Sequence, residues 1–141
     1  NCSSHQGYLA KSLRFAADTA GYQELLRASA SALGALAISG DVPSTELLIE
    51  IGAPSRDPAR AAIALALGAV ALRNTPAMLK VLESQADPKP GIVLIGEAFD
   101  MLEEDLEEER FFAAVRKGYW AAPDGSPARK IATALIQTLE F

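Results

Sequence analysis

Residues 59–72 read ARAAIALALGAVAL, and this stretch decides the fold. Arg60 is its only charged residue, so a helix built from it has no polar face. Alanine and leucine both favour a helix, because they lose little conformational entropy on entering one. A helix that is apolar all round has to be covered on every side. We therefore expect residues 59–72 to form the central helix of the domain.

A related stretch lies 34 residues earlier in the chain. Residues 28–38 read ASASALGALAI, residues 62–72 read AIALALGAVAL, and seven of the eleven positions are identical. Each stretch holds one glycine, Gly34 or Gly68, which costs a helix about 1 kcal/mol relative to alanine. We expect these glycines to allow close approach of neighbouring helices. Repeats of about 30 to 45 residues, each a helix pair, are typical of a solenoid.

Proline pairs mark the helix starts. Proline suits the first turn of a helix, and Ser, Thr or Asp before it can cap free N–H groups. Such pairs occur at Asp57-Pro58, Thr75-Pro76, Asp87-Pro88 and Ser126-Pro127, with a looser signal at Asp41. The predicted helices span residues 7–17, 21–39, 44–52, 58–73, 76–85, 90–106, 108–120 and 127–140. Instead of a break near residue 107, a single helix over residues 90–117 is the alternative. Residues 91–96 could form a strand only in isolation.

These segments predict an all-α chain, either a short helical-repeat solenoid or an irregular helical bundle. We expect a flexible N-terminal segment over residues 1–6 and a single helical domain over residues 7–141. The length of 141 residues fits one domain. The longest apolar run, residues 61–72, is too short to cross a bilayer, so no membrane span is expected.

Residues 46–52 read ELLIEIG, residues 57–60 read DPAR, and residues 61–71 read AAIALALGAVA. These segments resemble the first helix, the turn and the second, buried helix of the HEAT-repeat family, and the resemblance spans residues 44–104. The match is good over 44–73 and partial over 75–104, where Gly91 replaces the arginine. The resemblance implies an interaction scaffold and carries over no catalytic residue. We expect Asp57 and Arg60 to supply a helix cap and an ion pair between helices.

The residues that catalysis needs are nearly absent. His5 and Cys2 are the only histidine and cysteine, so a His/Cys metal site and a Ser-His-Asp triad are disfavoured. No nucleophile elbow, phosphate loop or dinucleotide fingerprint occurs. The net charge of −5 argues against nucleic-acid binding. We predict a protein without enzymatic activity or cofactor; a carboxylate enzyme with a bound metal is the remaining catalytic alternative.

Charge is the most distinctive feature. Residues 97–109 hold eight acids and no base. Such a run forms either a solvated face or a docking surface for a basic partner. Tyr119 and Trp120 follow, and Trp120 either closes the core over the last helix or anchors a partner. The predicted partner-binding residues are Glu103, Glu104, Glu107, Glu108, Tyr119 and Trp120.

Three functions remain open from the sequence. The favoured one is an inhibitor or immunity-type protein that neutralises a basic protein partner. The second is an adaptor or assembly scaffold, anchored as a bacterial lipoprotein if Cys2 is a lipidated mature N-terminus. The third is the metal-dependent enzyme. The location expected from the sequence is the cytoplasm or, if Cys2 carries a lipid, the periplasm. The sequence leaves open whether a signal peptide preceded Asn1.

Overall fold

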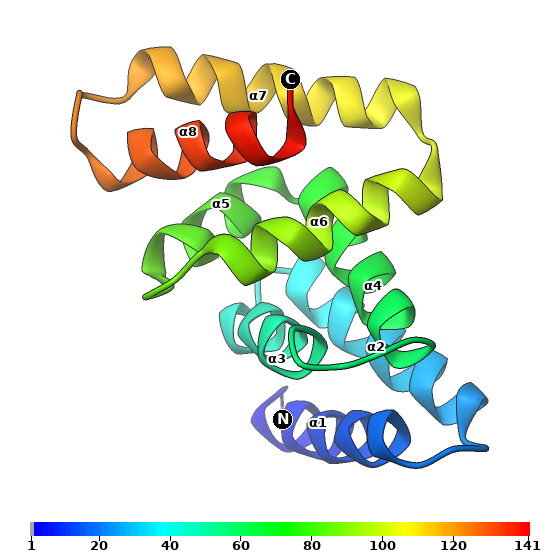
Figure 1. The fold of residues 1–141 in the computed structure, drawn as a ribbon. Helices are drawn as coiled ribbons and strands as arrows, with labels where there is room; N and C mark the ends of the chain where they lie inside the picture. The colour runs from blue at the N-terminus through cyan, green and yellow to red at the C-terminus, as the bar shows by residue number, and fades with distance from the viewer. Residues whose placement is uncertain (1) are drawn as a thin grey trace.

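The computed structural model describes residues 2–141, and their side chains from residue 5 onward. Helices account for most of this part of the chain, and it contains no strand, which confirms the all-α prediction (Figure 1). Residues 91–96 accordingly lie within a helix. The elements are α1 (Cys2–Asp18), α2 (Gln23–Ile38), α3 (Val42–Gly52), α4 (Ala59–Arg73), α5 (Thr75–Ser84), α6 (Lys89–Leu102), α7 (Asp105–Ala121) and α8 (Pro127–Leu139).

The start of the first helix and the break between α6 and α7 differ from the prediction by three residues or more. α1 begins at Cys2 rather than near residue 7, and the Gln6 side-chain amide within it donates a hydrogen bond to the Asp41 carboxylate at 2.7 Å. The break expected near residue 107 lies instead between Leu102 and Asp105. A single helix over 90–117 is therefore excluded.

The predicted helix caps are confirmed at the starts of α3 and α8, and Asp57 and Asp87 accept backbone N–H bonds at the starts of α4 and α6. Asp41 caps α3 and Ser126 caps α8, each by accepting a backbone N–H bond. Before α5 the cap is Asn74 rather than Thr75. The Asn74 amide also donates to the Ile38 carbonyl at 2.8 Å, so one side chain caps α5 and ties its start to the end of α2.

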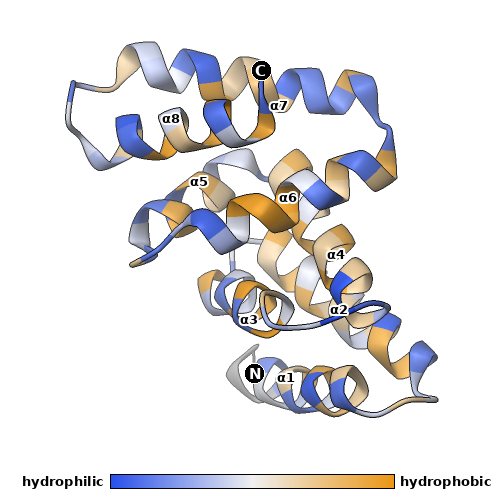
Figure 2. Cartoon of the chain, viewed as in Figure 1, coloured by the Kyte–Doolittle hydropathy of each residue, from blue (hydrophilic) through white to orange (hydrophobic). Residues whose placement is uncertain are grey.

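Helix α4 lies at the centre of the fold. It packs between α2 and α6, and it also contacts α3, α5 and α7 (Figure 1). α1 packs on α2 and α3 at one end of the molecule, and the α7–α8 hairpin covers α5 and α6 at the other. Apolar residues concentrate along α4 and α6, whereas the start of α7 is hydrophilic (Figure 2).

The prediction that residues 59–72 form the central helix is confirmed, but one face of α4 is not covered. Ile63, Leu67 and Val70 are fully buried. Leu65 and Ala66 are only half-buried, because they line a shallow groove of about 450 Å³ between α2 and α4. No single helix in the described chain is long and apolar enough to cross a membrane; α4 and α5 reach that composition only together, with a bend of 115°.

Both glycines of the repeated stretch lie at helix contacts, as predicted. A Cβ atom built on Gly34 would lie 3.4 Å from the Cβ of Ala66, where α2 meets α4. A Cβ atom built on Gly68 would lie 2.5 Å from the Cβ of Ala98, where α4 meets α6. The second contact leaves no room for a methyl group, and the first is close to ordinary van der Waals contact.

We expect Leu67→Ala to lower the free energy of unfolding by about 2–5 kcal/mol, because it leaves a cavity in the centre of the fold. Urea denaturation followed by circular dichroism measures this loss. A loss below about 0.5 kcal/mol would contradict the central position of α4.

The two glycines give a matched pair of substitutions. Gly68→Ala should lower the free energy of unfolding by about 1–3 kcal/mol, because the overpacking of Ala98 exceeds the gain in helix propensity. Gly34→Ala should be neutral or stabilising by up to about 1 kcal/mol, since its methyl group fits. Equal effects of the two changes in urea denaturation would contradict the difference in helix spacing.

Candidate functional site

The break between α6 and α7 forms an acidic corner. Glu103 ends α6 in the left-handed region, with φ of 51°, and its backbone N–H donates to the Phe99 carbonyl at 3.2 Å. The chain then turns into α7. The turn gathers exposed carboxylates from the end of one helix and the start of the next. We define the acidic corner as Asp100, Glu103, Glu104 and Asp105, all of them exposed.

The acids at the two ends of the predicted run are neutralised within the protein. Glu97 accepts two hydrogen bonds from the Arg60 guanidinium, at 2.8 and 2.7 Å, and these lower the pKa of Glu97. Glu109 pairs with Arg116 at 2.9 Å. The four acids of the acidic corner form no ion pair with any described residue. The eight acids are therefore not one continuous surface.

Arg60 and Asp57 have the structural roles predicted for them. The Asp57 carboxylate accepts the Ala61 N–H at 3.1 Å in the first turn of α4. Arg60 bridges α4 to Glu97 of α6, and it also donates to the Ala53 carbonyl at 2.7 Å. The arginine thus joins the end of α3, the start of α4 and the middle of α6.

The predicted surface residues Glu107 and Glu108 are half-buried. One carboxylate oxygen of Glu108 is buried without a hydrogen-bond partner. Burial raises the pKa of Glu108, and the nearby acids Asp105, Asp100 and Glu103 raise it further. The pKa of Glu104 is also raised, and the largest cause is its hydrogen bond with Glu107. Negative charge is therefore unfavourable in and beside the acidic corner.

The predicted association of acids with Tyr119 and Trp120 is not present. Both aromatic residues lie at the far end of α7, about 22 Å from Asp105 at a rise of 1.5 Å per residue. Trp120 is 76% exposed, so the prediction that it closes the core is wrong. Phe111 closes the core instead, together with Phe112, whose ring stacks on the C-terminal Phe141. The Arg129 guanidinium lies over the ring of half-buried Tyr119, 3.9 Å from its centroid.

Two exposed apolar residues beside the acidic corner were missed by the sequence reasoning. Met101, in the last turn of α6, is 44% exposed, and Leu106, in the first turn of α7, is 71% exposed. The available signal was their position inside the acidic run, where a purely solvated helix surface would hold polar residues.

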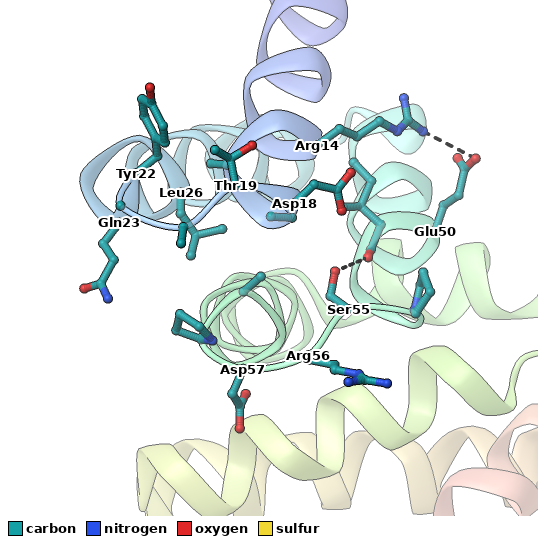
Figure 3. Close-up of a pocket in the computed structure, with 18 residues that line it drawn as sticks. Arg14, Asp18, Thr19, Tyr22, Gln23, Leu26, Glu50, Ser55, Arg56 and Asp57 are labelled. Carbon is teal, nitrogen blue, oxygen red and sulfur yellow. Dashed lines mark hydrogen bonds and ion pairs between the residues drawn. The ribbon is translucent and has the colours of Figure 1, made fainter.

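A second feature is a cleft of about 710 Å³ between the α1–α2 turn and the loop that joins α3 to α4 (Figure 3). Its rim carries both signs of charge, with Arg14 paired to Glu50 at 3.4 Å. Asp18, Arg56 and Asp57 complete the charged lining. Because the charges are mixed and partly paired, the cleft favours no one class of ligand. None of the predicted site residues lies in it.

The described residues contain no group of three or more His, Cys, Asp and Glu side chains that could hold a metal ion. The side chain of Cys2, the predicted lipid attachment point, lies outside the described side chains. Comparisons with protein-family models, with curated proteins and with solved structures give no match.

The environment of Glu108 predicts a pH-dependent stability effect. Because its pKa is raised, the folded protein binds this proton at a higher pH than the unfolded chain does, and the charged form lowers stability at neutral pH. Glu108→Gln should therefore raise the free energy of unfolding at pH 7, by less than about 1 kcal/mol because solvent screens a half-buried group.

The gain from Glu108→Gln should vanish as the pH falls through the raised pKa to below the usual glutamate range, where both side chains are neutral. Urea denaturation at pH 7 and at about pH 3.5 measures the difference. Glu109→Gln is the control, since that exposed carboxylate is paired with Arg116 and should show no gain at pH 7. A gain that is independent of pH would contradict the electrostatic cause.

Proposed function

We propose that this protein is a non-enzymatic protein-binding module, of the inhibitor or immunity type, whose acidic corner docks a basic protein partner. The observation that carries the proposal is the set of exposed, unpaired carboxylates at the corner, with exposed Met101 beside them. The positive charge of Arg73 opposes the raised pKa of Glu104. A partner that brings lysine or arginine side chains adds the ion pairs that the described residues do not supply to these acids.

The electrostatics of the isolated protein support this proposal. Burial raises the pKa of Glu108, a hydrogen bond with Glu107 raises the pKa of Glu104, and repulsion from neighbouring acids raises both further. A cationic partner relieves this repulsion on binding. Clustered charge of one sign also speeds the diffusional encounter with an oppositely charged partner and discriminates against others.

We further propose that the scaffold is a short HEAT-like solenoid. The succession of helix pairs α1–α2, α3–α4 and α5–α6 supports this, since α2, α4 and α6 pack in a row. The close contacts at Gly34 and Gly68 recur at equivalent places in two of these pairs. Stacked arrays of this kind serve as binding scaffolds, and the acidic corner is the turn that follows the last of these pairs.

The test neutralises the corner and leaves the fold intact. A partner is first captured with the wild-type protein, and its association rate is then measured for the variant Asp100→Asn/Glu103→Gln/Glu104→Gln. We expect the rate to fall about tenfold at low salt, because the electrostatic attraction is lost. The wild-type rate should itself fall as salt rises, since exposed charges are screened over about 8 Å at physiological ionic strength.

The control changes the same net charge elsewhere. Glu24→Gln/Glu46→Gln/Glu83→Gln removes three exposed carboxylates from α2, α3 and α5, and it should slow association much less than the corner variant. Equal rates for the corner variant and the wild type, with no salt dependence, would overturn the acidic corner as the docking surface. Equal losses in both variants would show that only net charge matters.

A further inference from the structure

One face of α7 is exposed along the whole length of the helix. α7 lies along the outer edge of the fold (Figure 1), and its inner side is anchored by buried Phe111 and Val115. At 100° per residue, five exposed residues lie within a sector of roughly 80° on the opposite side. We define the outer face of α7 as Leu106, Glu109, Ala113, Lys117 and Trp120.

The spacing of the outer face is symmetric about Ala113. Its other members lie four and seven positions before Ala113 and four and seven positions after it. Helix positions that recur at three- and four-residue intervals lie on one face, and such a face is the geometry with which two helices pack. Because the pattern reads alike in both directions, an identical helix running antiparallel brings matching positions to the same level.

The chemistry along the outer face is complementary to itself in this antiparallel arrangement. The first half of α7 carries the acids Asp105, Glu107, Glu108 and Glu109. Arg110, Arg116 and Lys117 follow, and no further acid occurs before Asp124. On the outer face itself, Glu109 lies in the first half and Lys117 in the second, so an antiparallel pair places the acid of each helix level with the base of the other.

We infer that the outer face of α7 is the contact surface of a homodimer, in which two copies of α7 pack antiparallel about a twofold axis at Ala113. The small Ala113 side chain lets the two helices approach at the axis. Leu106 of each chain lies level with Trp120 of the other, so the two most exposed large apolar side chains of the described chain are covered. Glu109, which pairs with Arg116 of its own helix, also lies level with Lys117 of the second copy.

A single helix pair buries little surface. Stable interfaces usually exceed about 1,000 Å² in total, so this dimer forms at high protein concentration and dissociates on dilution. The inference goes beyond the proposed function, because it uses the outer face of α7 and not the acidic corner. Partner binding measured on dilute monomer is therefore independent of it.

The first test uses the symmetry axis. Ala113→Cys, in a Cys2→Ser background, should give a covalently linked dimer with a short bis-maleimide, since a residue on a twofold axis meets its own copy. Ala35→Cys, at an exposed position on α2, is the matched control and should link at a rate at least about tenfold lower. Equal linking rates at the two positions would overturn the proposed axis.

The second test uses charge. Sedimentation equilibrium should show a concentration-dependent dimer for the wild type, and Trp120→Ser or Glu109→Lys should weaken it about tenfold. Adding Lys117→Glu to Glu109→Lys restores opposite charges between the copies and should recover the dimer. A wild type that stays monomeric to about 1 mM, or a double variant no better than Glu109→Lys alone, would overturn the inference. Unchanged helical circular dichroism excludes unfolding as the cause.

Discussion

The structure depends on α4 having no polar face. Water cannot solvate a helix of alanine, leucine, isoleucine and valine favourably, and each large side chain buried contributes about 1.5–3 kcal/mol. Burial of Ile63, Leu67 and Val70 therefore requires α2, α3, α5 and α6 to pack against α4. The contact with α6 depends in turn on a small residue, because only glycine at position 68 lets α6 approach α4 so closely.

Arg60, the one charge inside the apolar stretch, orients this packing. Its guanidinium is the donor to the Ala53 carbonyl at the end of α3 and to both Glu97 oxygens on α6. A planar group with fixed donor directions makes such bonds in one relative arrangement of the helices only. The same ion pair neutralises Glu97, so Glu97 is not among the unpaired acids that a partner could bind.

Acidic and basic residues are separated along the chain from the end of α6 to the end of α7. The acidic corner follows α6, the acidic half of α7 comes next, and its basic half ends at exposed Trp120. The protein thus presents uncompensated negative charge at one turn and a self-complementary face along the adjoining helix. Both features are available for association with other molecules, and the mixed charges of the large cleft offer no comparable selectivity (Figure 3).

The sequence by itself determined the helical class, the central helix and most helix starts, because apolar patterning and Asp or Ser before proline act locally. It also predicted the glycine contacts and the pairing role of Arg60. Only the tertiary structure decided that Glu97 is paired, that Trp120 is exposed and lies far from the acids, and that Met101 is exposed. These outcomes depend on where α6 turns into α7 and on which residue meets Arg60 across the fold. Contacts between residues distant in the chain leave no local pattern in the sequence.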